Sequence, residues 1–263
     1  MERRSGIAGP CIVVAVALSA VIAVTAQASP EIVSCYKTVK VEGVYKGHYK
    51  NKTCTEKASE EEVDLGGRAN KYEFDAGEKW TVKGKTVKLV SAEVDVVCSK
   101  SAGSGTVLTP TQLSGVFRFN GCTERSSEPL PIGCNTYPES LEKDEINTRR
   151  LIGVIGEGAG GEVLVSFTRQ AGTEPAPQES FAEFQCGGPV TSFNIYGTLS
   201  GRWTEAVNKT TKKGGIDFAV GTGEQELIEQ FSNPISDELE EDPATLESTQ
   251  SYKFADKYEM RQE

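Results

Sequence analysis

The chain has 263 residues, with 28 Lys and Arg against 38 Asp and Glu, a formal net charge of -10, one histidine and seven cysteines. Its 37% of hydrophobic residues and 27 glycines approach the composition of an ordinary globular domain, which argues against wholesale disorder. Proteins that bind nucleic acids neutralise phosphates with clustered Lys and Arg, so the acidic balance argues against a nucleic-acid partner.

The N-terminus has the three-part layout of a secretory signal. The positive start Met1-Glu2-Arg3-Arg4 precedes an apolar run from Cys11 to Val24, and the small residues of Ala26-Gln27-Ala28 follow it. We therefore expect residues 1–28 to be a signal peptide and the mature protein to be secreted or displayed at the cell surface. The alternative is an uncleaved N-terminal anchor, because Ile7–Ala26 has about the ~20 residues that span a bilayer. A membrane would then be a partner only through this uncleaved signal.

Cleavage after residue 28 leaves an even number of cysteines, which in an exported chain predicts three disulfides. They are Cys35, Cys54, Cys98, Cys122, Cys134 and Cys186. Six cysteines allow fifteen pairings, and spacing alone cannot choose among them. Cys35 and Cys54 flank a short two-strand segment, Cys122 and Cys134 flank a turn-rich loop, and Cys98 and Cys186 each end an alternating strand. We therefore expect the pairs Cys35–Cys54, Cys98–Cys186 and Cys122–Cys134.

The next elements along the chain predict a β-fold. Residues Glu56–Leu65 are the best candidate for a short helix or loop. From Val90 onward apolar and polar residues alternate with the period of a half-buried strand. The alternating segments are Val90–Cys98, Phe117–Phe119, Val163–Phe167, Ala182–Cys186, Phe193–Leu199 and Ile216–Val220. Turn residues separate these segments, so we predict an all-β, mainly antiparallel sandwich or barrel, with the choice between the two left open.

Residues Gly156–Gly161 match the G-x-G-x-x-G pattern of dinucleotide-binding loops. A phosphate at such a loop needs the N-terminus of a helix immediately afterwards. Here Glu162–Phe167 alternates and carries β-branched residues, which predicts a hairpin connection and no cofactor.

The composition changes after residue 223. The last 40 residues hold 12 acids and three bases. We therefore divide the mature chain into a disulfide-stapled β domain, 29–223, and an acidic C-terminal segment, 224–263. In this segment Glu224–Phe231 suggests two helical turns, Ser236–Thr249 suggests a solvated loop, and Tyr252–Met260 suggests a closing strand. Asp237–Asp242 is acidic but lacks the spacing of a calcium loop, so we interpret it as a soluble segment and leave calcium binding open.

No residue pattern points to a catalytic or metal centre. His48 cannot complete a Cys/His metal site, because no Cys-x-x-Cys pair occurs, and in its polar hairpin it suggests an exposed imidazole without a catalytic role. Two carboxylates could hydrolyse a glycoside without histidine, but a sequence does not give their separation. Tyr45, Tyr49, Tyr72 and Trp80 could stack against sugars, although aromatic residues at this density are more typical of sheet packing. We name no catalytic, cofactor-binding or metal-ligating residue.

Several short motifs resemble a group of exported, disulfide-bonded, β-rich proteins of high-GC Gram-positive bacteria that has no assigned activity. They are Cys35 to Cys54 followed by Tyr72-Glu73-Phe74, Val97-Cys98, Phe119-Asn120-Gly121-Cys122, Cys134 ahead of Asp144-Glu145-Ile146, Phe184-Gln185-Cys186-Gly187-Gly188 and Gly197-Thr198-Leu199-Ser200-Gly201. The resemblance implies an extracytoplasmic β-fold with three bridges and supplies no catalytic residues.

These observations favour a non-enzymatic structural or binding module of the cell envelope, with the cell wall or a polysaccharide as its contact. The alternative is an extracellular carbohydrate-active hydrolase that uses paired carboxylates. The ligand and the oligomeric state do not follow from the sequence.

Overall fold

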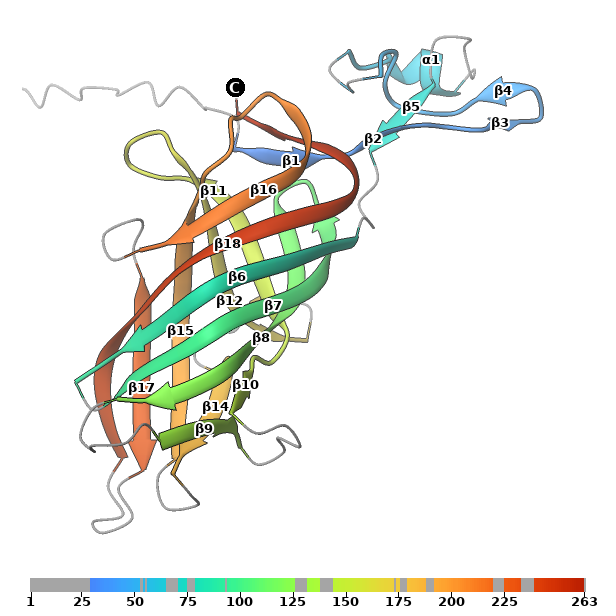
Figure 1. Ribbon diagram of the computed structural model, residues 1–263. Helices are drawn as coiled ribbons and strands as arrows, with labels where there is room; N and C mark the ends of the chain where they lie inside the picture. The colour runs from blue at the N-terminus through green and yellow to red at the C-terminus, as the bar shows by residue number, and fades with distance from the viewer. Residues whose placement is uncertain are drawn as a thin grey trace, which may run out of the picture.

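The computed structural model describes residues 29–262, apart from 53, 55, 65–70, 75–78, 93, 126–131, 138–143, 173, 176–178, 188–191, 220–224 and 233–238. The predicted signal peptide, residues 1–28, lies outside the described residues. The described chain forms an antiparallel β-barrel with a small N-terminal module at one end (Figure 1).

Eight strands close the barrel. They are β6 (Lys79–Val90), β7 (Asp95–Thr109), β8 (Gln112–Glu124), β11 (Leu151–Glu157), β12 (Val163–Ala171), β15 (Ser192–Trp203), β16 (Thr210–Phe218) and β18 (Leu239–Arg261). Each pairs antiparallel with the next in this order, and β18 pairs back to β6. Closure gives every strand of the ring two neighbours, which removes the exposed sheet edges that invite aggregation. The all-β prediction is therefore confirmed. Of the two architectures left open by the sequence, a sandwich and a barrel, the structure has the barrel.

Shorter strands extend the barrel at one end. They are β9 (Ile132–Thr136), β10 (Glu145–Asn147), β13 (Glu174–Pro175), β14 (Ala182–Cys186) and β17 (Glu226–Ser232). There β9 and β14 continue the wall from β8 to β15, and β17 joins β15 to β18. The strands that run through both parts are long: β7 has 15 residues and β18 has 23, against the roughly 3–10 of ordinary strands.

The barrel interior is filled by side chains that point inward at every second position. Trp80 is 1% exposed, and its ring lies 5.2 Å from that of Tyr252 and 6.0 Å from that of Phe117, centroid to centroid. Glycine makes room for this indole, because a Cβ at Gly105 or Gly115 would come within 2.4 or 2.3 Å of its ring atoms. An eight-stranded barrel is just wide enough for side chains to fill in this way.

The N-terminal module precedes the barrel. Its elements are β1 (Glu31–Val33), β2 (Cys35–Lys37), β3 (Lys40–Val41), β4 (Val44–Tyr45), α1 (Glu60–Asp64) and β5 (Tyr72–Phe74). β1 pairs with β18 of the barrel, whereas β2 pairs with β5 and β3 with β4. Ser59 and Glu62 cap α1 reciprocally, since the Glu62 amide donates to Ser59 Oγ and the Ser59 amide donates to Glu62 Oε2. Of the two alternatives predicted for Glu56–Leu65, a short helix or a loop, the structure has the helix.

The disulfides join Cys35 to Cys54, Cys98 to Cys122 and Cys134 to Cys186. The first pair agrees with the sequence analysis, but the predicted pairs Cys98–Cys186 and Cys122–Cys134 are wrong. Cys98 lies directly opposite Cys122 in the β7–β8 ladder, and Cys134 lies directly opposite Cys186 in the β14–β9 ladder. Strand register therefore decides both pairings. Three disulfides indicate a protein of an oxidising, extracytoplasmic compartment.

The acidic C-terminal segment forms part of the barrel wall. The helical turns expected over Glu224–Phe231 are wrong, because β17 occupies Glu226–Ser232. The solvated loop expected over Ser236–Thr249 is also wrong in its described part, where β18 runs from Leu239. Ser248 and Gln250 are polar but face inward, and the side-chain Nε2 of Gln250 donates to Ser248 Oγ. Because these inward positions hold polar residues, the sequence does not show the apolar alternation that predicts a strand. Tyr252–Met260 continues β18, as predicted for a closing strand.

Candidate functional site

The cavities that described residues line inside the barrel are small. Two of them have volumes of about 30 Å³ and about 20 Å³, and both are lined mainly by apolar side chains. Pockets for small molecules are usually about 300–1,000 Å³. Neither cavity approaches that size.

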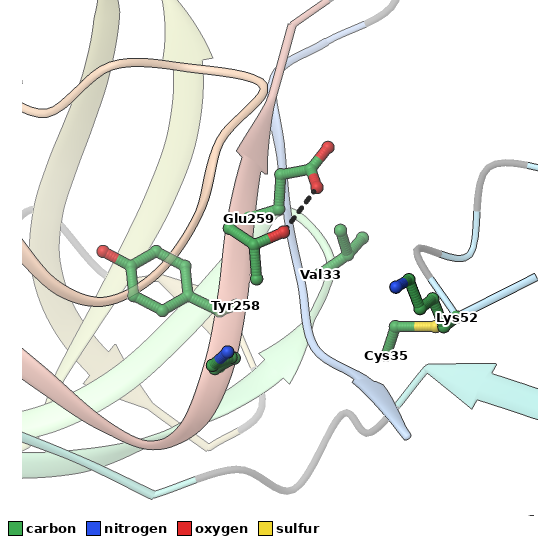
Figure 2. Close-up of a pocket in the computed structure, with 7 residues that line it drawn as sticks. Val33, Cys35, Lys52, Tyr258 and Glu259 are labelled. Carbon is green, nitrogen blue, oxygen red and sulfur yellow. Dashed lines mark hydrogen bonds between the residues drawn. The ribbon is translucent and has the colours of Figure 1, made fainter. Parts of the chain in front are cut away.

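A larger cavity, of about 310 Å³, lies where the N-terminal module meets the barrel (Figure 2). We call it the junction pocket. Its lining residues are Val33, Cys35, Lys52, Thr210, Lys257, Tyr258 and Glu259. In Figure 2, Lys52 lies on the side of the module and Glu259 on the side of β18.

Backbone pairing and one disulfide assemble the junction pocket. Glu259 of β18 lies between Val33 of β1 and Thr210 of β16, to both of which it is paired in register. The Cys35–Cys54 bond holds the loop that carries Lys52 next to the start of β2. Arg261 Nη1 donates to the Cys54 carbonyl at 2.7 Å, which fastens this loop to the end of β18. The pocket therefore depends on contacts between the two ends of the described chain.

The charges of the junction pocket favour an anionic ligand group. Glu259 Oε1 lies 3.3 Å from Arg261 Nε, and Glu259 Oε2 accepts from Thr210 Oγ1 at 3.3 Å. This carboxylate is thus already neutralised within the protein. Lys52 and Lys257 make no ion pair among the described residues, so their charges remain available. A lysine ammonium binds phosphate or carboxylate as a flexible point charge.

The described residues of the junction pocket include one carboxyl group, whereas a typical glycosidase uses two. Such an enzyme places two carboxyl groups about 5 to 9.5 Å apart around the scissile bond. Among the residues that line the pocket, Glu259 alone carries a carboxylate, and Arg261 and Thr210 hold it. The described lining therefore does not supply the pair of carboxyl groups that the hydrolase alternative uses.

His48 lies outside the junction pocket, on an exposed loop of the module. Its side chain is 67% exposed, and its ring Nδ1 contacts Glu73 Oε2, to which the His48 amide also donates at 3.0 Å. All six cysteines of the described chain are in disulfides, so no thiol is available as a nucleophile beside it. The exposed imidazole agrees with the sequence analysis.

The four aromatic residues considered for sugar stacking do not share one surface. Trp80 is buried in the barrel, whereas Tyr45, Tyr49 and Tyr72 belong to the module. Trp80 therefore packs in the barrel core, in agreement with the interpretation that these aromatic residues pack within the sheet.

The glycine-rich motif is a hairpin, as predicted. β11 and β12 pair antiparallel on either side of it, and the Gly158 amide donates to the Glu162 carbonyl at 2.8 Å. A strand follows the glycines, where a phosphate-binding loop would need a helix.

The acidic stretch Asp237–Asp242 is described only from residue 239 onward, where it belongs to β18. Within the described part of the chain, no group of three or more His, Cys, Asp and Glu could hold a metal ion.

In the described part of the chain, no helix has both the length and the apolar composition needed to cross a membrane.

Sequence analysis did not identify the junction pocket. Its polar members, Lys52, Thr210, Lys257 and Glu259, are ordinary surface residues in the sequence. The pairing of β1 with β18 and the hydrogen bond from Arg261 to Cys54 bring the module to the barrel, and neither is visible in the sequence. No protein-family model, no curated protein and no solved structure matches this chain.

Proposed function

We propose that the protein is a secreted or cell-surface binding module of the cell envelope, without catalytic activity, and that the junction pocket receives an anionic group of an envelope polysaccharide. The observation that carries the proposal is that one cavity of about 310 Å³ contains two available lysines, Lys52 and Lys257, together with one carboxylate, Glu259, that Arg261 already neutralises. The filled, disulfide-bonded barrel would act as a rigid support for this pocket. The resemblance to exported β-rich proteins of high-GC Gram-positive bacteria stays a prediction.

The test is retention of the disulfide-bonded protein on a carboxylated or phosphorylated polysaccharide, compared with a neutral glucan. We expect retention on the anionic polymer only. Replacing Lys52 and Lys257 together by alanine should weaken binding about tenfold, because each exposed charge pair contributes up to about 1 kcal/mol. The control variant, Lys83→Ala with Lys88→Ala, removes two exposed lysines from the outer wall at β6 and should bind like the unchanged protein.

Sugar release in the same assay would contradict the proposal and favour the hydrolase. Equal retention on the neutral glucan would contradict the anionic specificity. Export has its own test: N-terminal sequencing of the protein recovered from the medium or cell surface should begin at Ser29. A protein that retains residues 1–28 would support the membrane-anchored alternative.

A further inference from the structure

The hairpin of the N-terminal module carries a concentration of positive charge in an otherwise acidic protein. Residues 36–52 contain five lysines and one glutamate, whereas the whole chain has a formal net charge of -10. Figure 1 shows that the β3–β4 end of this segment points away from the barrel. The charges at the β3–β4 end therefore lie where a large partner can reach them.

Three of these cations gather around one aromatic ring. The ammonium groups of Lys37, Lys40 and Lys71 lie 5.8, 5.1 and 5.4 Å from the centroid of the Tyr45 ring. We call these three lysines the lysine collar. Cation–π attraction to the ring offsets part of the repulsion among them. Among the described residues no carboxylate forms an ion pair with the collar; Glu73, on the neighbouring strand, contacts His48.

The local fold imposes this arrangement. Lys40 lies directly opposite Tyr45 in the β3–β4 ladder, and Lys37 lies opposite Tyr72, the residue after Lys71. The buried Thr38 donates from both its amide and its hydroxyl to the Lys71 carbonyl, at 2.6 and 3.0 Å. The turn at Glu42 and Gly43 has positive φ at both residues, as a tight two-residue hairpin requires. The backbone thus brings all three lysines of the collar close to one aromatic ring.

Exposed apolar side chains accompany the lysine collar. Val39 is 78% exposed, Val41 is 52% exposed and Tyr36 is 46% exposed, so three of the most exposed large hydrophobic residues of the described chain lie within six positions. A soluble polyanion would need the lysines but not the valines. The surface of an anionic bilayer uses both, because apolar side chains enter the headgroup region while lysines contact phosphates.

We propose that residues 36–46, together with Lys71, dock the protein on an anionic lipid surface. Val39 and Val41 enter the headgroup region, and the lysine collar binds lipid phosphates around the Tyr45 ring. This site is separate from the junction pocket and differs from anchoring through an uncleaved signal. It places the barrel beside the membrane while the junction pocket remains available to its own ligand.

The experiment is co-sedimentation of the disulfide-bonded protein, recovered after secretion, with vesicles of equal parts phosphatidylglycerol and phosphatidylcholine. Vesicles of phosphatidylcholine alone are the lipid control. We expect binding to the anionic vesicles only, and weaker binding as the salt concentration rises. Each lysine near an anionic surface contributes about fivefold, so the variant Lys37→Ala, Lys40→Ala, Lys71→Ala should bind about a hundredfold more weakly.

Matched variants separate this site from general electrostatics. Lys83→Ala, Lys88→Ala, Lys253→Ala removes the same charge from the exposed barrel wall and should bind vesicles like the unchanged protein. Val39→Ser with Val41→Ser keeps the charge and should lose most vesicle binding. The pocket variant Lys52→Ala, Lys257→Ala should still bind vesicles, so failure of the proposed function and failure of this inference give different results.

Three outcomes would overturn the inference. The first is no binding of the unchanged protein to anionic vesicles. The second is an equal loss in the barrel-wall control. The third is full vesicle binding by the valine variant together with collar-dependent retention on heparin, which would identify the site as one for soluble polyanions. Intact disulfides and an unchanged circular dichroism spectrum establish that each variant is folded.

Discussion

At the scale of single residues, the barrel centre contains polar atoms that have no partner among the described residues. Trp80 Nε1 and Tyr252 Oη are buried and make no hydrogen bond with any residue that the structure describes. Burial also raises the pKa of the Tyr252 phenol well above its ordinary value of 10.0. A buried polar group without a partner costs about 1–3 kcal/mol, so the Tyr252 hydroxyl reduces the stability of the barrel.

Tyr252→Phe should therefore stabilise the protein by about 1 kcal/mol. It should also remove an alkaline loss of stability. The folded-state pKa of Tyr252 exceeds the unfolded value of about 10, so above about pH 10 the unfolded chain releases this proton and stability falls as pH rises. Urea unfolding near pH 7 and near pH 11, with disulfides intact, measures both effects.

The matched control is Tyr196→Phe. Its hydroxyl donates to Gln230 Oε1 at 3.2 Å, so this variant should lose about 1 kcal/mol of stability near pH 7. Equal destabilisation by both substitutions would show that the Tyr252 hydroxyl is satisfied in solution.

At the scale of elements, two disulfides act as cross-strand links. Cys98–Cys122 joins β7 to β8 and Cys134–Cys186 joins β9 to β14, each between residues directly opposite in register. The first link closes 24 residues between long neighbouring strands. The second closes 52 residues and holds β9, a five-residue strand that pairs with the barrel strand β8 over only two residues. We therefore expect the Cys134–Cys186 bond to stabilise the extended end of the barrel more than the Cys98–Cys122 bond does.

Replacing Cys134 and Cys186 by alanine should cost about 4 kcal/mol in the chain-entropy model, and replacing Cys98 and Cys122 about 3.5 kcal/mol. Denaturant unfolding of the two double variants gives the comparison. Peptide mapping without reduction checks its basis and should recover the three pairs of the structure. Recovery of a Cys98–Cys186 peptide would instead restore the pairing expected from the sequence and contradict the β7–β8 register.

At the scale of the whole molecule, the closed ring makes the two ends of the chain depend on each other. β18 pairs with β6, β16, β17 and β1, so the last described strand contacts the first strands of both the barrel and the module. The boundary at residue 223 marks a change in amino-acid composition and not a boundary in the fold, because the acidic residues after it complete the barrel wall. Glu241 faces solvent from β18, while Ala244 and Leu246 face the core.

A chain that ends at residue 223 should therefore fail to fold. Without β17 and β18 the edges of β6, β15 and β16 are open and their apolar faces are exposed, which favours aggregation. The comparison is the yield, thiol content and circular dichroism of residues 29–223 against residues 29–263 after oxidative refolding. A monomeric, cooperatively unfolding shorter chain with its thiols blocked would show that the acidic segment is an appendage.

The sequence by itself determined the features that depend on near neighbours. Period-two alternation identified Val163–Phe167 as a strand and placed Cys98 inward, and glycines without a following helix identified the β11–β12 hairpin. The single strand predicted over Val90–Cys98 is wrong in its first half, because β6 ends at Val90 and β7 begins at Asp95. These patterns are local, because side-chain direction in a strand and the conformation of a tight turn depend on a few adjacent residues.

Only the tertiary structure decided which strands are neighbours. Register selected Cys122 for Cys98, closure made a strand of the acidic Leu239–Thr249 region, and the return of β18 to β1 created the junction pocket. Alternation states which face a residue occupies but not which residue stands opposite. That choice depends on the packing of the whole ring, so contacts between distant segments override local propensity.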